Sequence, residues 1–220
     1  MLEALASALG ARGLNVTLPL DAAAFDAACA PTLTLASLLP DARGALVVGA
    51  AGRAFFDGFT RARADGSLAV GPDPLDRYTR AVVDETTRAA LAPLGVAHAT
   101  HFPFMGASVG GVVIPFQRLG RAAGLAATSP LGLQIHPIYG AWWAYRALVV
   151  VDVELPPGAP LSDACAGCPA PCVTACPAGA VRREGFDVPA CHARRRRPLS
   201  RCVRPAPTRL AAEGGPLAFR

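Results

Sequence analysis

Four cysteines stand close together in the last quarter of the chain, and their spacing suits a single metal centre. They are Cys165, Cys168, Cys172 and Cys176, and Pro177 follows the last of them. Thiolates gathered so closely are ligands for a soft metal, and a cysteine followed by proline is typical of iron–sulfur proteins rather than zinc sites. The spacing therefore predicts a four-iron (4Fe–4S) cluster held by these four side chains.

The ligand set leaves alternatives open. The middle gap holds three residues where the bacterial ferredoxin run has two. A structural zinc site and a disulfide cluster are the competing interpretations, and His192 beside Cys191 keeps zinc open. Cys191 and Cys202 also compete with Cys176 for the last ligand position. Six cysteines cannot fill two four-iron clusters, which take four thiolates each, so we expect one cluster.

A second candidate stretch lies upstream, at residues 135–146. It holds both tryptophans and two of the three tyrosines of the chain. His136 precedes Pro137, and a residue before proline is held extended, which suits a side chain presented into a cleft. From residue types alone, the stretch is either such a binding surface or an aromatic core strand with a satisfied histidine.

The elements that must position these residues follow from hydrophobic spacing and turn signals. Pro156, Pro157 and Gly158 interrupt the pattern of helices and strands, which predicts a boundary between a first domain over 1–155 and a cysteine segment with an arginine-rich tail over 156–220. Helices and strands alternate irregularly, which predicts an α+β fold with a mixed or antiparallel sheet. We expect helices over 2–9, 21–29, 52–62, 74–94 (N-cap Asp73) and 115–126, strands over 44–50, 96–102 and 147–155, and a glycine-rich turn at 106–111.

Composition narrows the function classes. The chain has 220 residues, 52% of them hydrophobic, which is enough for a packed core. All 21 basic residues are arginine, so a Schiff-base lysine and a phosphate-loop lysine are excluded. No apolar run is long enough to span a bilayer, and the first residues lack the basic region of a signal peptide. We therefore expect a cytoplasmic protein without a membrane partner.

Charge is distributed unevenly along the chain. Residues 1–164 carry 11 arginines and 13 acids, whereas residues 165–220 carry 10 arginines and 3 acids. The densest run extends from Arg194 to Arg197. We interpret this run as a solvated loop, with a site for an acidic protein or for nucleic acid as the alternative. Nucleic acid is not among the partners that we expect.

The stretch from His136 to Trp142 resembles a known family. Its His-Pro-x-aromatic-Gly-x-Trp pattern, followed by Arg146 and a valine-rich strand, is similar to that of the CblC-type cobalamin-processing proteins. The order of a helix at 117–125, this turn, a strand and a ferredoxin cysteine run is similar to the epoxyqueuosine reductases. The resemblance implies a nitroreductase-like α+β sandwich that binds cobalamin, followed by a small ferredoxin-like segment. Residues 106–115 contain no carboxylate where the reductases carry an acidic residue, which argues against reduction of epoxyqueuosine itself.

The resemblance also implies roles for individual residues. His136 would line the corrin face or contact its edge. Tyr139 and Trp142, on either side of Gly140, would offer flat apolar surface. Arg146 would meet a propionamide group of the corrin or an acidic co-substrate.

Together these inferences predict an iron–sulfur oxidoreductase. The cluster would pass electrons to a cobalamin, or alternatively to a flavin, in the first domain. Its partners would be an electron-donor protein or reductase and a small-molecule substrate or corrinoid. Two other functions stay open, namely an electron-transfer module whose first domain is a cofactor-free docking platform, and a metal-dependent regulatory protein.

Overall fold

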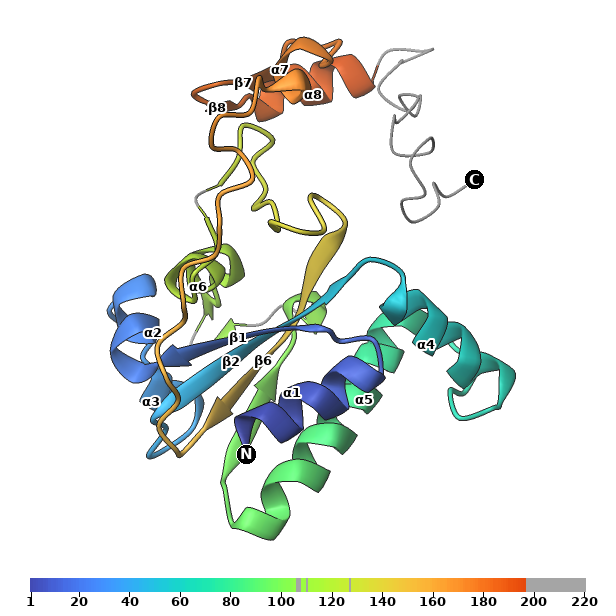
Figure 1. Ribbon diagram of the computed structural model, residues 1–220, viewed down its shortest axis with the longest axis vertical. Coiled ribbons are helices and arrows are strands. Elements are labelled where there is room, and N and C mark those ends of the chain that lie inside the picture. The colour runs from blue at the N-terminus through green and yellow to red at the C-terminus, as the bar shows by residue number, and fades with distance from the viewer. Residues whose placement is uncertain (106–107, 110, 127, 197–220) are drawn as a thin grey trace. The chain divides into compact units, whose positions relative to one another are not determined.

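The computed structural model describes residues 1–105, 108–109, 111–126 and 128–196, and its contacts divide the chain into two compact units (Figure 1). The first, here called the sheet unit, consists of Met1–Leu125 and Trp142–Ser162. The second, the cysteine unit, consists of Ala126–Ala141 and the chain from Asp163 onward. The domain boundary expected after residue 155 stays a prediction. Each unit is described by itself.

The sheet unit is built on four antiparallel strands in the order β1-β2-β6-β3. Every residue of β2 is buried, and the last five residues of β6 are buried as well. Valine and alanine dominate both central strands, as expected for strands covered on both faces. This sheet with its helices confirms the predicted α+β class, whereas the nitroreductase-like sandwich stays a prediction. The strands are β1 Val16–Asp21, β2 Gly44–Ala51, β6 Trp143–Val151 and β3 His98–His101.

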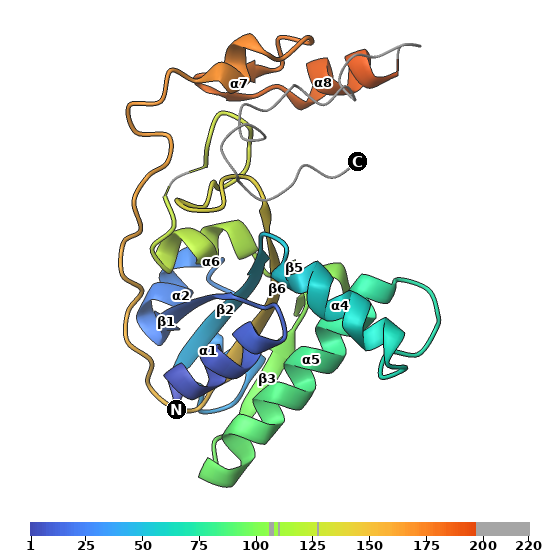
Figure 2. The same cartoon turned by 45° about the vertical axis from the view of Figure 1, so that its right-hand side comes forward.

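Helices cover both faces of this sheet (Figure 2). Three of them, α1, α4 and α5, pack on the face that presents Leu46, Val48 and Val149, and together they form the main hydrophobic core. On the other face, α6 approaches Tyr145 so closely that a β-carbon on Gly120 would stand 2.0 Å from the tyrosine hydroxyl oxygen. The helices are α1 Leu2–Ala11, α2 Ala22–Ala28, α3 Leu35–Leu38, α4 Ala54–Ala64, α5 Pro74–Leu91 and α6 Phe116–Ala122.

Short elements complete the described chain. In the sheet unit they are the 3₁₀ turns η1 Ala92–Leu94 and η2 Pro103–Met105 and the paired strands β4 Ser108–Val109 and β5 Val112–Val113. In the cysteine unit they are α7 Pro171–Thr174, the antiparallel hairpin of β7 Val181–Arg182 and β8 Gly185–Phe186, and α8 Val188–Arg195. None of the described helices is long and apolar enough to cross a membrane.

The elements expected from the sequence are largely present, with shifted ends. Asp73 was expected to cap α5 with its side chain, but its backbone is left-handed, with φ 47°, and no side-chain cap bond forms. The helix therefore starts from Pro74, which suits a first turn. Strand β6 begins at Trp143, four residues before the expected start. The expected turn at 106–111 lies partly outside the described residues.

Candidate cluster and cofactor sites

The four clustered cysteines lie on consecutive tight turns. Gly167, with φ +70°, reverses the chain between Cys165 and Cys168, and the amide of Cys168 donates to the carbonyl of Cys165 at 3.2 Å. Ala170, with φ +57°, then leads into α7, which carries Cys172. A loop of this kind, too irregular for a long helix, allows thiols at short spacing to turn toward a common point.

Electrostatic coupling shows which of these thiols interact. Burial raises the pKa of Cys165, and the neighbouring Asp163, Cys168 and Cys172 raise it further. Repulsion of this kind disfavours the thiolate form of Cys165. A bound metal centre would instead favour the thiolate over the thiol, because coordination to a cation deprotonates the sulfur.

The thiol of Cys176 faces a run of backbone amides. Burial raises its pKa, but hydrogen bonds from the N–H groups of Val181, Ala178, Ala180 and Gly179 lower it by more, so the net shift is downward. Hydrogen bonds to sulfur stabilise a thiolate and are one of the means by which proteins tune iron–sulfur clusters. The donor set at Cys176 therefore fits a cluster ligand.

The metal site as a whole stays a prediction. Across residues 1–105, 108–109, 111–126 and 128–196, no group of three or more His, Cys, Asp or Glu side chains is placed to hold a metal ion. The six described cysteines are free thiols.

The remaining cysteines lie elsewhere. Cys191 lies in α8, where its amide donates to the carbonyl of Asp187, and Cys202 lies outside the described residues. In the sheet unit, burial raises the pKa of Cys29 to about 11, and this thiol packs as a small hydrophobic residue.

His136 opens a closed turn in the cysteine unit. Its amide and carbonyl pair with the carbonyl and amide of Gly140, both at 2.9 Å. Gly140 has φ +59°, a left-handed conformation that glycine adopts without strain. The rings of His136 and Tyr139 lie 5.0 Å apart between centroids. The turn therefore holds these two side chains, both expected to contact a cofactor, next to each other.

The hydrogen bonds of His136 define its protonation. Its Nδ1 accepts the N–H of Ile138 at 3.2 Å and that of Tyr139 at 3.4 Å. A ring nitrogen that accepts two amides carries no proton, so the neutral ring is protonated on Nε2. Burial lowers the pKa of His136, which favours this neutral form. The Nε2 lone pair is therefore not available to a metal while the turn keeps this conformation.

The loop that carries His136 touches the hairpin that follows the cysteines. A β-carbon placed on Gly132 would stand 3.3 Å from Cβ of Phe186, at the end of β8. Figures 1 and 2 both show the loop 128–141 beside this hairpin. No sequence pattern predicts this contact, because Gly132 and Phe186 belong to no recognisable motif.

Arg146 lies at a β-bulge in the sheet unit. The register between β2 and β6 pairs Val48 with Ala147 and Gly49 with Tyr145, so Arg146 is the extra residue. A bulge redirects the extra side chain, and bulges are frequent near active sites. Here it directs Arg146 over the ring of Phe55 in α4, with Cζ 4.4 Å from the ring centroid.

The guanidinium of Arg146 is only partly satisfied. Its Nε is buried and has no hydrogen-bond partner among the described residues. Burial lowers the pKa of Arg146, and the charge of Asp76 in α5 acts in the opposite direction. A buried donor without an acceptor is costly unless a ligand supplies one, which fits the role expected for Arg146.

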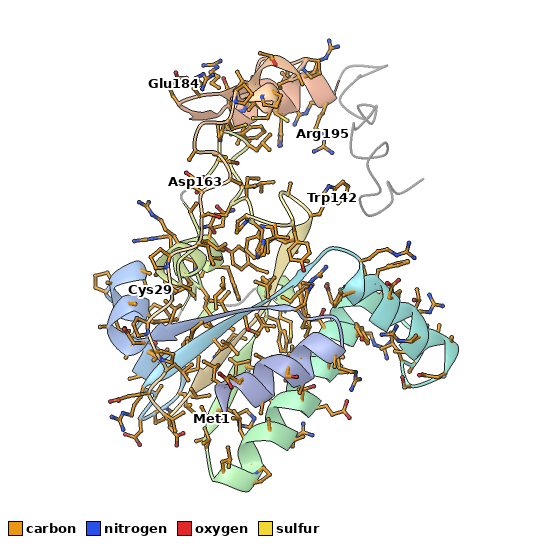
Figure 3. All side chains as sticks on the ribbon, in the orientation of Figure 1. Met1, Cys29, Trp142, Asp163, Glu184 and Arg195 are labelled. Carbon is orange, nitrogen blue, oxygen red and sulfur yellow. The ribbon has the colours of Figure 1, made fainter. Side chains whose placement is uncertain are left out.

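The five predicted cofactor residues fall in two units. His136, Tyr139 and Gly140 belong to the cysteine unit, and Trp142 and Arg146 to the sheet unit. Trp142 is labelled in Figure 3, and its side chain is 66% exposed, which leaves a large apolar surface for a ligand. The five remain a predicted site.

Comparison with known proteins gives matches among solved structures. No family model matches the sequence, and no curated protein matches it. An epoxyqueuosine reductase in complex with a tRNA-Tyr epoxyqueuosine-modified stem loop matches with a TM-score of 0.56 at 15% identity, over 84% of this chain and 54% of that one. The Streptococcus thermophilus epoxyqueuosine reductase matches with a TM-score of 0.55 at 12% identity, over the same shares of the two chains.

A third match is the B12-trafficking protein CblC of C. elegans. Its TM-score is 0.53 at 12% identity, and the match covers 73% of this chain and 75% of that one. The chain spans about half the length of the epoxyqueuosine reductases that it matches. These neighbours confirm the resemblance expected from the sequence, and at such low identity they show a shared fold.

Proposed function

We propose that this protein is an iron–sulfur oxidoreductase that binds a corrinoid and reduces it with electrons passed from a four-iron cluster. The observation that carries the proposal is the composition of the cysteine unit. In it, the loop of His136 and the four clustered cysteines form one compact body. The fold shared with CblC and epoxyqueuosine reductase supports the same conclusion.

Four thiols would hold the cluster, with Cys165, Cys168 and Cys172 on the turns and Cys176 under the amides of residues 178–181. When bound, a four-iron cluster accepts and releases single electrons at low potential. The residues of this chain supply the surroundings, because backbone amide donors at Cys176 stabilise the negative charge of a thiolate.

The corrinoid would be held by residues that each show a suitable local structure. His136 would contact it without ligating cobalt, since Nδ1 is occupied and Nε2 carries the proton. Arg146 has a buried Nε that lacks an acceptor, which a propionamide oxygen or a carboxylate could supply. Trp142 would provide apolar surface. Flavin, which is flat and carries anionic phosphate, stays the alternative occupant.

The test is anaerobic reconstitution followed by cobalamin titration. Protein with stoichiometric iron and sulfide should absorb broadly at about 400 nm and bleach with dithionite. Added cobalamin should shift to a base-off spectrum, whereas added flavin should not bind. Colourless protein with stoichiometric zinc would rule out the cluster. A cluster without any cobalamin shift would instead favour an electron-transfer module with a docking domain.

Nucleic acid returns as a candidate partner. It was not among the partners expected from the sequence, but one structural neighbour was solved with a tRNA stem loop. The net positive charge of residues 165–220 is compatible with phosphate contacts. A filter-binding titration with a tRNA stem loop at two salt concentrations tests this, and salt-independent or absent retention would exclude RNA.

A further inference from the structure

We propose that residues 155–161 form a rigid strap that packs on the end of α6 and holds side by side the two points where the chain leaves the sheet unit. The strap lies entirely within that unit, whose second stretch is Trp142–Ser162. The proposal goes beyond the proposed function, because it rests on packing and on a backbone hydrogen bond and requires neither a cluster nor a corrinoid.

The strap turns every third residue toward the sheet unit. Leu155 is buried, and Gly158 and Leu161 are partly buried. A period of three is typical of the polyproline II conformation, which suits proline-rich segments and contains no internal hydrogen bonds. The strap therefore has one packed face, and the residues of its solvent face are Pro156, Pro157, Ala159 and Pro160.

Leu155 anchors the start of the strap. A β-carbon placed on Gly44, the first residue of β2, would stand 2.7 Å from Cγ of Leu155, so the glycine leaves the room that this side chain fills. Leu155 also belongs to the main hydrophobic core of the sheet unit. Burial of an aliphatic side chain is favourable, and it holds this end of the strap against the sheet.

The middle of the strap lies directly on the backbone at the end of α6. A β-carbon on Gly158 would stand 2.5 Å from the carbonyl carbon of Ala123. On the other side of the contact, a β-carbon on Gly124 would overlap the carbonyl group of Ala159. Two glycines thus allow main chain to pack on main chain, and Figure 2 shows this stretch as an orange coil beside α6.

A backbone hydrogen bond closes the end of the strap. The amide of Leu161 donates to the carbonyl of Gly124 at 2.7 Å. Directly after these two residues the chain leaves the sheet unit, once at Leu125 and again at Ser162. The two segments that make up the cysteine unit therefore start from adjacent points of the sheet unit, although all of β6 lies between these points in the sequence.

Nuclear magnetic resonance of the full chain, under reducing conditions and without added metal, tests the proposal. We expect Gly158, Ala159 and Leu161 to have amide order parameters of about 0.85, as in rigid backbone, whereas a flexible linker falls below about 0.6. Hydrogen exchange measures the strength of the closure. After correction for intrinsic rates, the amide of Leu161 should exchange at least about tenfold more slowly than that of Ser162.

Variants at the other end of the strap test whether it behaves as one body. Leu155→Ala removes the anchor without a clash, and the Leu161 amide should then exchange at least about tenfold faster. Gly158→Ala should have a larger effect, because its β-carbon meets the backbone of Ala123. Ala159→Ser, on the solvent face, is the matched control and should change nothing. Leu9→Ala, in the same core, controls for general destabilisation and should affect the Leu161 amide less than Leu155→Ala does.

Two results would overturn the proposal. One is an order parameter below about 0.6 at residues 158–161 of the wild type. The other is exchange of the Leu161 amide that responds to Leu155→Ala no more than to Leu9→Ala. Circular dichroism checks that each variant is folded, and Leu155→Ala decides the matter where Gly158→Ala does not fold. Failure of the proposed function is seen separately, because these measurements involve neither iron nor cobalamin.

Discussion

Gly13 lies directly against the backbone of Phe55, so that a β-carbon on Gly13 would stand 2.5 Å from Cα of Phe55. The close approach brings the end of α1 next to the first turn of α4. The ring of Phe55 in turn lies under the guanidinium of Arg146. Gly13 therefore helps to position the aromatic ring on which the predicted ligand-binding side chain of Arg146 packs.

Gly13→Ala should therefore destabilise the protein strongly. Its φ of +90° disfavours alanine, and the new β-carbon would meet backbone atoms of Ala54 and Phe55 that cannot rotate away. We expect a loss of more than about 2 kcal/mol in the free energy of unfolding. Urea unfolding measures it. Gly10→Ala is the matched control, since nothing lies within 4 Å of a β-carbon there and the residue is helical. It should stabilise by up to about 1 kcal/mol.

Arg146→Met should separate stability from binding. Methionine keeps the packing on Phe55 and removes a buried Nε that has no partner among the described residues. The lost cation–π contact and the relieved donor are similar in size, so the free energy of unfolding should change by less than about 1 kcal/mol. Cobalamin affinity, measured by spectroscopic titration, should fall at least about tenfold, or about 1.4 kcal/mol. Arg88→Met, at an exposed site in α5, should change neither, and unaltered affinity in Arg146→Met would contradict the assignment.

Serine variants should identify the last cluster ligand. The amides that face the sulfur of Cys176 favour it over Cys191, which belongs to α8. Cys176→Ser should lose most of its iron and sulfide, while Cys191→Ser should retain them, by chemical analysis and electron paramagnetic resonance. Cys202→Ser completes the series. Retention of a full cluster by Cys176→Ser would transfer the ligand role to one of the other two thiols.

His101 should make the stability of the sheet unit depend on pH. Its Nε2 is buried and finds no partner among the described residues, and burial lowers the pKa of His101. Below about pH 6.5, the pKa of histidine in the unfolded chain, His101 is protonated in the unfolded chain but stays neutral in the folded chain. The contribution of His101 is therefore complete above that pH and is lost as the pH falls toward the lower folded pKa, by up to about 1.4 kcal/mol per pH unit.

His101→Leu should remove this part of the pH dependence. Urea unfolding from about pH 8 to about pH 5 should show a shallower decline in the variant than in the wild type. The difference between the two curves isolates His101 from other titrating groups, among them His136. Parallel curves would contradict the argument.

The sequence predicted most of the sheet unit because hydrophobic spacing is local. The buried strand at 44–50 was visible as an uninterrupted apolar run, and the long helix after Asp73 as apolar residues at helical spacing. Strand β1 was missed, since Pro19 interrupts it and its pattern of alternating burial is short. Proline is tolerated there because β1 lies at the edge of the sheet.

The candidate sites were less accessible to sequence reasoning. Cysteine spacing pointed to the cluster, but the amides that face Cys176 come from ordinary residues, Ala178 to Val181, and only the folded turn reveals them. The contact of Gly132 with Phe186 joins segments more than fifty residues apart, and the bulge at Arg146 depends on pairing with β2. Contacts of this kind follow from tertiary packing, so no local pattern encodes them.

The bulge at Arg146 also decides which helix the side chains before it face. Because of the extra residue, Trp143 and Tyr145 face α6, while Ala147 and Val149 face α5. If the ladder closed regularly at the present chain length, Arg146 would pair with Gly49, and every side chain before it would exchange faces. Tyrosine and tryptophan would then enter the aliphatic layer under α5. Deletion of Arg146 would instead keep Tyr145 opposite Gly49, so natural variants that lack the bulge should be one residue shorter at this point.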